Sequence, residues 1–299
     1  MENLINVNKK FNGVIFKNKF FEFLDVSSNE TIRTYRNGIG NFMQYLFDNG
    51  ISLPNRESVV AWKTSLKETS SSSTVNTYLV AVKAFFNFLE MYGMYPNVSK
   101  YVKGYKVSAT PKKNVLTQEQ IKTIYNGLTD LREKALFGLL ITTGMRGVEV
   151  SNAKIENLKM VNGEYVLYIK CKGHTEYDEY VKIADNIMED LVNYIGDRTS
   201  GHIFTSTSNH NTGNGVTTLT IRRIIKAIFK RFGIDDETIS LHSTRRTFAC
   251  VAYNNGASIY EIQQVLHHVS ITTSQRYLKQ ADRDNNSSEK TIANILACN

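Results

Sequence analysis

Two segments, one near the middle of the chain and one beyond it, contain cations and an imidazole that could act on an anionic group. In Thr143–Val150, Arg146 follows an apolar helical pattern and lies between two glycines, which let a guanidinium approach a ligand closely. In Leu241–Ala249, His242 and Arg245 are three residues apart, so on a helix they share one face. An imidazole beside a fixed cation suits proton transfer on an anion.

Two further segments add imidazoles and a phenol. Val265–Ser270 contains the adjacent histidines His267 and His268, and Ser270–Lys279 contains Tyr277. Taken singly, these segments also fit ordinary structural roles, such as a packing histidine or a core tyrosine. Metal binding by the two histidines is disfavoured, because adjacent helical side chains point about 100° apart and no third ligand is near in the sequence.

A polar stretch divides the chain into two parts. Residues 108–114, with Pro111, are typical of an interdomain linker, so we expect domains over residues 1–107 and 115–299. The first part has 13 Lys plus Arg against 8 Asp plus Glu, a net charge of +5 on about a third of the chain. This excess fits either a DNA-binding surface or an ordinary solvated helical surface.

Apolar spacing predicts that the first part is entirely helical. Residues recur every three or four positions from Ile32 to Leu46, from about Arg56 to Lys67 and from Val75 to Leu89, and no strand pattern occurs before residue 107.

The second part combines helices with a small sheet. Thr117 and Asp130 begin predicted helices, and the second of these ends at Gly144. Val161–Glu164 has the Asn-Gly signature of a type I′ hairpin, and strands are predicted at 165–169 and 180–183. The predicted fold is mainly α, an N-terminal helical bundle followed by a mixed α/β domain with a three-stranded antiparallel sheet. Thr272 is expected to cap a short helix that contains Tyr277.

Composition narrows the class of protein. The 299 residues are 41% hydrophobic, carry a formal charge of +8 and have a pI of about 9.2. No run reaches the ~18 apolar residues of a membrane span, and the N-terminus lacks a secretion signal. The three cysteines are far apart, with no CxxC pair, so we expect no zinc site, no disulfide framework and a cytoplasmic location.

The motifs are much more specific as an ordered set. Gly-Met-Arg-x-x-Glu is followed by Lys172-Gly173, His-x-x-Arg, Leu-x-His and Thr-Thr-x-x-x-Tyr, with His268 nine residues before Tyr277. From about Leu116 to Lys279 the sequence resembles the tyrosine recombinase family, also called phage integrases. The helical first part is similar in architecture to that family's core-binding domain.

The resemblance implies a site-specific DNA recombinase and assigns seven residues to its reaction. They are the nucleophile Tyr277, the phosphate-binding Arg146 and Arg245, the accompanying His242 and His268, the sheet-turn lysine Lys172, and the supporting carboxylate Glu149.

Physical chemistry gives these residue types their tasks. Two guanidiniums can bridge the non-bridging oxygens of a phosphodiester where charge builds in the transition state. A neutral phenol is a poor nucleophile, so Tyr277 needs a base, for which His242 is the candidate. His268 is expected to donate a hydrogen bond to the phosphate, and Lys172 to protonate the leaving 5′ oxygen. The covalent 3′-phosphotyrosine retains the phosphodiester energy, so neither ATP nor a cofactor is expected.

Three positions depart from the family pattern. The turn after Lys172 is unusually acidic over residues 174–180, which leaves Lys170 as an alternative to Lys172. His267 occupies the position that is usually Gly before the later histidine. Arg246 follows the second arginine, where His is frequent, and is expected to contact backbone or phosphate.

The resemblance also implies partners. These are duplex DNA, held in a C-shaped clamp by the two domains, and three further copies in a tetramer on two DNA sites. The tail 285–299 would pack either on a neighbouring protomer or on its own domain. The resemblance is also compatible with accessory DNA-bending proteins, with action on a mobile element and with association with the nucleoid. The alternatives are type IB topoisomerase-like DNA relaxation and a catalytically silent DNA-binding regulator.

Overall fold

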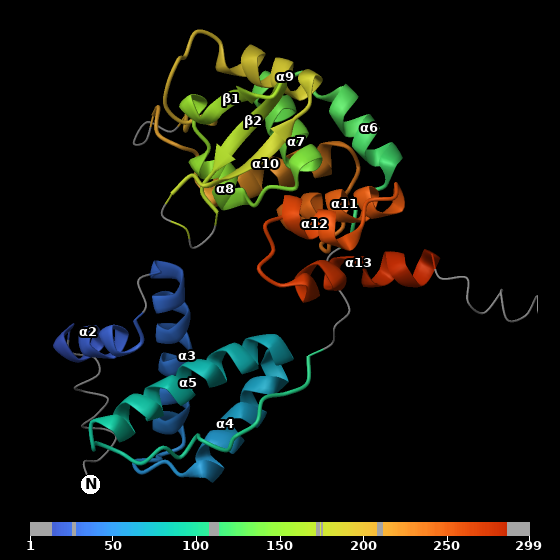
Figure 1. The fold of residues 1–299 in the computed structure, drawn as a ribbon. Helices are drawn as coiled ribbons and strands as arrows, with labels where there is room; N and C mark the ends of the chain where they lie inside the picture. The colour runs from blue at the N-terminus through green and yellow to red at the C-terminus, as the bar shows by residue number, and fades with distance from the viewer. Residues whose placement is uncertain are drawn as a thin grey trace, which may run out of the picture. The chain divides into compact units, whose positions relative to one another are not determined.

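The computed structural model describes residues 14–25, 28–107, 114–171, 174, 176–207 and 212–285, with side chains described from residue 18 to residue 278. The chain divides into two compact units, residues 1–108 and 109–299 (Figure 1). Each unit has its own hydrophobic core. The predicted linker at 108–114 lies almost wholly outside the described residues. So do Lys172 and residues 286–299 of the tail.

The first unit is built from helices packed around an aromatic core. Its described helices are α2 (Val14–Phe23), α3 (Asn29–Asp48), α4 (Arg56–Thr69) and α5 (Ser72–Met91). Helix α5 packs against the other three. Gly38 lets α3 approach α5 closely, because a Cβ atom there would lie 3.1 Å from the Cβ of Ala81. The sequence patterns predicted α3, α4 and α5 but missed α2.

The second unit is a set of helices with a small sheet at one side. Its elements are α6 (Gln118–Gly127), α7 (Leu131–Thr143), α8 (Gly147–Asn152), η1 (Ile155–Asn157), β1 (Leu158–Val161), β2 (Glu164–Ile169), β3 (Glu179–Ile183), α9 (Asp185–Ile195), α10 (Thr218–Arg231), α11 (Leu241–Asn254), α12 (Ile259–Val265) and α13 (Ile271–Asn285).

The sheet is an antiparallel meander in the order β1-β2-β3. Val161 pairs with Glu164, and the two residues between them, Asn162 and Gly163, both have positive φ (52° and 81°), as a type I′ turn requires. The predicted hairpin and the predicted fold class are both confirmed, with no strand assigned to the described part of the first unit.

Helix α7 is the centre of the second unit. It packs against α9, α11, β3 and α10, and nearly all its residues are buried. Asp130 caps its start by accepting from the backbone N–H of Glu133, and Gly144 ends it with φ 64°. The sequence predicted both ends.

A small apolar cluster separate from the main core joins α11, α12 and α13. Its buried members are Ala249, Ile262, Leu266 and Leu278. Figure 1 shows these three helices (orange to red) gathered together. Because Leu278 follows Tyr277 directly, this cluster determines where α13 presents the tyrosine.

The helices that the structure describes include none with an apolar stretch of membrane-spanning length.

We expect Leu278→Ala to destabilise the protein by about 2–5 kcal/mol, because it removes a fully buried side chain from this cluster. Urea denaturation measures the loss. The control Val80→Ala, at an exposed valine on α5, should change the free energy of unfolding by less than about 0.5 kcal/mol. Equal effects at the two positions would contradict a packing role for Leu278.

Candidate active site

The phenol of Tyr277 lies between two imidazoles. Its Oη is 2.9 Å from Nε2 of His242, which α11 presents at its first turn. The rings of His242 and His268 both meet the tyrosine ring edge to face, with centroids 5.5 and 5.2 Å away. The backbone carbonyl of Tyr277 accepts from Nε of Arg246 at 3.4 Å. Tyr277 is therefore held through both its ring and its backbone.

The helix that carries Tyr277 differs from the prediction. Helix α13 begins at Ile271, so Thr272 is not its cap, and it extends for 15 residues. The backbone N–H of Thr272 donates instead to the hydroxyl of Ser270, which lies before the helix. Ser270, two residues before Thr272, therefore has the side-chain contact at the helix start that was predicted for Thr272.

Arg146 occupies the N-cap of α8, and Glu149 one turn later binds it twice. One carboxylate oxygen accepts from the backbone N–H of Arg146 at 2.6 Å, and the other accepts from its Nη1 at 2.7 Å. Glu149 is completely buried. This local pairing fixes the guanidinium at a helix start, where backbone N–H groups are free to bind an acidic side chain.

Arg245 is buried and binds the carbonyl ends of two helices. Its Nη1 donates to the carbonyl of Gly144 at 2.7 Å, and its Nη2 donates to the carbonyl of Leu266. Gly144 and Leu266 are the C-caps of α7 and α12, where carbonyls lack helical partners and a cation is favoured. Its Nη1 also lies 4.0 Å from Glu149. Glu149 therefore contacts both arginines.

The electrostatics of Arg245 reflect this crowding. Burial lowers its pKa from the usual value for arginine, and the positive charge of Arg146 lowers it further. Glu149 and the Tyr277 phenol act in the opposite direction, stabilising the charged guanidinium. These interactions bring Arg146, Arg245 and Tyr277 into one electrostatic environment.

His268 lies in the turn between α12 and α13 and is buried. Its Nδ1 is 2.8 Å from the hydroxyl of Ser274, one turn into α13. Burial, then the charges of Arg245 and Arg146, lower the pKa of His268 to about 3. Its imidazole is therefore neutral at physiological pH in the free protein.

Two of the candidate residues have a buried nitrogen atom with no hydrogen-bond partner among the described residues. The atoms are Nε of Arg245 and Nε2 of His268. An unpaired buried polar group is costly, and each such atom in a folded protein needs an explanation. Both atoms belong to residues that the resemblance assigns to a phosphate, a group that offers acceptor oxygens.

His267 has an unusual backbone for a residue that is not glycine. Its φ is +47°, and the N–H groups of His267 and His268 bond back to the carbonyls of Gln264 and Gln263. This is the Schellman motif that ends α12, in which the left-handed position favours Gly. A side chain there costs about 1–2 kcal/mol. The imidazole is mostly buried, and its Nδ1 lies 3.2 Å from Oε2 of Glu179.

Arg146, His267 and His268 border one open cavity of about 790 Å³. Its lining includes Arg146, Cys171, Glu179, His267 and His268. No three His, Cys, Asp or Glu side chains in the described parts of the chain gather as a metal site.

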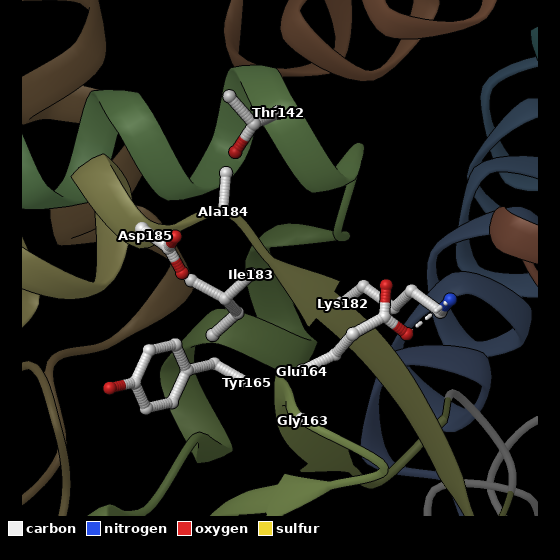
Figure 2. Close-up of a pocket in the computed structure, with 8 residues that line it drawn as sticks. All are labelled: Thr142, Gly163, Glu164, Tyr165, Lys182, Ile183, Ala184 and Asp185. Carbon is white, nitrogen blue, oxygen red and sulfur yellow. Dashed lines mark ion pairs between the residues drawn. The ribbon is translucent and has the colours of Figure 1, made fainter.

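A second hollow, of about 520 Å³, lies at the other end of the β2–β3 hairpin. Figure 2 shows its lining, which includes Thr142, Tyr165 and an ion pair between Lys182 and Glu164. None of the candidate site residues lines it, so it is separate from the cavity at Arg146.

The structure thus brings together Arg146, Glu149, His242, Arg245, His268 and Tyr277, from segments 131 residues apart along the chain. Lys172 lies outside the described residues, while Lys170 follows β2 and is half-buried. Ser274 and Glu179, which contact His268 and His267, were not among the predicted site residues. Ser274 lies one turn before Tyr277 on α13, but no sequence pattern indicated the pair of Glu179 and His267.

Two family models match most of the chain. The model "Phage integrase family" matches residues 114–284, and "Phage integrase, N-terminal SAM-like domain" matches residues 18–93. The tyrosine recombinase XerD of Oceanobacillus iheyensis is 25% identical over 86% of this chain and 91% of its own length. The tyrosine recombinase XerA of Pyrococcus horikoshii is 27% identical over 86% of this chain and 85% of its own length.

Solved structures share the fold. The XerH site-specific recombinase in a post-cleavage complex with difH substrate has a TM-score of 0.71, at 20% identity over 87% of this chain and 80% of that chain. A lambda integrase dimer bound to a core site has a TM-score of 0.67, at 16% identity over 90% of this chain and 77% of that one.

These findings define the class as a DNA strand-exchange enzyme of the tyrosine type. The chain belongs to the phage integrase family, whose catalytic-domain model covers more than half of it. It is a tyrosine-type site-specific DNA recombinase, as the motif set predicted.

The pH dependence of stability tests the environment of His268. An unfolded histidine takes up a proton below about pH 6.5, whereas the folded His268 stays neutral until about pH 3. The unfolded state binds more protons in this window, so the free energy of unfolding falls as the pH falls. We expect His268→Gln to reduce this slope between about pH 7 and pH 5 in urea denaturation. Identical slopes would contradict the assigned environment.

Proposed function

We propose that Tyr277 is the nucleophile that cuts duplex DNA and that the enzyme rejoins the strands in a new pairing. The observation that carries this proposal is the 2.9 Å approach of Tyr277 Oη to His242 Nε2 beside the buried Arg245. A phenol paired with a base and facing a cation is an activated nucleophile.

In the proposed reaction, His242 accepts the phenolic proton as Tyr277 Oη attacks the scissile phosphorus. The new bond joins Oη to phosphorus, and the bond from phosphorus to the 5′ oxygen breaks. The leaving 5′ oxygen takes a proton from Lys172, or from Lys170 in the alternative assignment. The product is a 3′-phosphotyrosine and a free 5′ hydroxyl. Attack by the 5′ hydroxyl of another strand reverses these steps, so no ATP is consumed.

The two arginines would stabilise the charge that develops on the phosphate. Arg146 and Arg245 share Glu149, so the three groups together carry a net charge of +1, which a phosphodiester anion would neutralise. The unpartnered Nε of Arg245 would donate to that anion, and Nε2 of His268 would donate as well when its Nδ1 accepts from Ser274. Preorganised donors of this kind are worth about 10²–10³-fold each in rate.

Helix α10 supports a DNA-binding surface in the second unit. One face buries Ile221, Ile225, Ile228 and Phe229, whereas Arg222, Arg223, Lys226 and Lys230 are exposed on the other face. The helix contains no carboxylate to neutralise them. Together with the net charge of the first unit, this face would supply the phosphate contacts that hold duplex DNA.

The proposed assembly is a tetramer on two DNA sites, supported by the lambda integrase tetramer bound to a Holliday junction, a fold neighbour. The tail would join neighbouring protomers. We place the enzyme in the cytoplasm, at the nucleoid, acting on a mobile element by integration, excision or resolution, with DNA-bending proteins as helpers. The relatives named tyrosine recombinases favour this function over topoisomerase-like relaxation or silent DNA binding.

A selected duplex tests the nucleophile. The Tyr277→Phe variant is used to enrich one duplex, called here the selected duplex, from a random-sequence pool. Nicked versions of this duplex should trap wild-type protein as a covalent adduct on denaturing gels, whereas Tyr277→Phe should give none while binding equally well. An adduct that persists in Tyr277→Phe would remove the assigned nucleophile. Two differently labelled duplexes should yield recombinant products, which a topoisomerase would not form.

Arg146→Ala should abolish adduct formation on the same nicked duplex yet leave gel-shift affinity nearly unchanged. The reason is that Arg146 acts on one phosphate in the transition state, while many other cations contribute to binding. A parallel loss of binding and cleavage would contradict this role.

Replacing Arg222 and Lys226 together by Ala should weaken DNA binding, in contrast to Arg146→Ala. We expect lower affinity for every DNA sequence, and a slope of log affinity against log salt concentration that is smaller in magnitude by about two. Unchanged affinity in the α10 variant at both low and high salt would contradict the proposed surface.

A further inference from the structure

His267 stands where the family pattern has glycine, and its backbone conformation is the one that favours glycine. An imidazole at this position is conformationally unfavourable, with φ at +47°. A residue held in a sparsely populated backbone region points to an interaction that compensates for the strain and to a functional role for that residue. The interaction is with Glu179, whose Oε2 lies 3.2 Å from His267 Nδ1.

Glu179 begins β3, so it marks the base of the hairpin turn that contains Lys172. It pairs across the sheet with Ile169 at the end of β2. Cys171, directly before Lys172, lines the same cavity as Glu179 and His267. Burial raises the pKa of the Cys171 thiol to about 11, and the nearby carboxylates of Glu149 and Glu179 raise it too. The two ends of the hairpin turn therefore converge beside His267.

The other nearby carboxylates are engaged elsewhere. Asp178 lies 3.0 Å from Nδ1 of His174, and Glu149 binds the arginines. Glu179 is therefore the carboxylate that faces the α12–α13 turn. On the other side of this turn, the backbone of His268 is fixed by its N–H bond to Gln263 and by the Gln263 amide, which donates to the His268 carbonyl at 3.0 Å.

We propose that His267 and Glu179 form a clasp that positions the turn bearing His268 against the start of β3. This inference rests on the proposed function, because His268 is assigned to the scissile phosphate. His267 and Glu179 are positioning residues: they need not touch DNA, and they act by fixing His268 relative to β3.

Four variants separate a clasp from a conformational effect. His267→Gly relieves the backbone but removes the imidazole. His267→Asn keeps a residue that tolerates the left-handed conformation and places an amide N–H donor at the same distance from Cα as Nδ1. Glu179→Ala breaks the pair from its more exposed side. Glu164→Gln is the matched control, since it removes a carboxylate from an exposed ion pair on the same sheet (Figure 2).

The readout is the single-turnover rate of adduct formation on the nicked selected duplex at saturating DNA. We expect His267→Gly and Glu179→Ala each to be slowed about tenfold, as a misplacement of catalytic groups would cause, with unchanged affinity for uncleaved duplex. His267→Asn and Glu164→Gln should remain within about twofold of wild type. The double variant His267→Gly, Glu179→Ala should be no slower than the slower single variant.

The proposal is overturned if His267→Gly cleaves at the wild-type rate, if His267→Asn is as slow as His267→Gly, or if the two single effects multiply in the double variant. Hydrogen exchange gives a second measurement that does not depend on cleavage. Glu179→Ala should speed exchange of the amides at 266–270, across space from the substituted strand. Unchanged exchange at these amides in Glu179→Ala would overturn the clasp. If Glu179→Ala speeds the exchange but the wild-type protein forms no adduct, only the proposed function is overturned.

Discussion

One buried carboxylate between two guanidiniums is the constraint on which the site depends. Glu149 binds Arg146 closely and lies 4.0 Å from Arg245, with no exposure to solvent. A buried charge is stable only when it is paired, and two neighbouring arginines repel each other without an anion between them. Glu149 satisfies both conditions, yet it supplies one negative charge against two positive ones. In the proposed function, the remaining positive charge would make the pair a receptor for one phosphate.

The site is built at the ends of helices. Arg146 begins α8, Arg245 binds the last carbonyls of α7 and α12, and His268 lies in the turn that ends α12. Backbone groups at helix ends lack helical partners, so they can fix charged side chains at little cost to the fold. The apolar cluster of α11, α12 and α13 then places Tyr277 against these groups. Helix ends therefore hold the charged side chains, and the apolar cluster holds Tyr277, the proposed nucleophile.

Sequence patterns predicted the parts of the molecule that depend on local interactions. Caps at Thr117 and Asp130, the glycine that ends α7 and the Asn-Gly hairpin each rest on residues within one turn of one another, and each was found. The ordered motif identified the candidate side chains because their spacing is shared with the family. Helix α2 was missed, and α13 begins before the predicted cap.

What the sequence could not predict are contacts between distant segments. Arg245 donates to carbonyls 101 and 21 residues away, and nothing in the residue types at Gly144 or Leu266 indicates this, because every residue has a carbonyl. The pair of His267 and Glu179 depends on how β3 and α12 pack, which local patterns do not report. Tertiary packing determines which of many chemically equivalent carbonyls and carboxylates become the partners.

The most direct test of this account is a crystal structure of Tyr277→Phe bound to the uncleaved selected duplex. We predict that the guanidiniums of Arg146 and Arg245 both lie within about 3 Å of non-bridging oxygens of a single phosphate, with the aromatic ring at position 277 facing its phosphorus. Arginines that contact two different phosphates, or a scissile phosphate remote from that ring, would contradict the account.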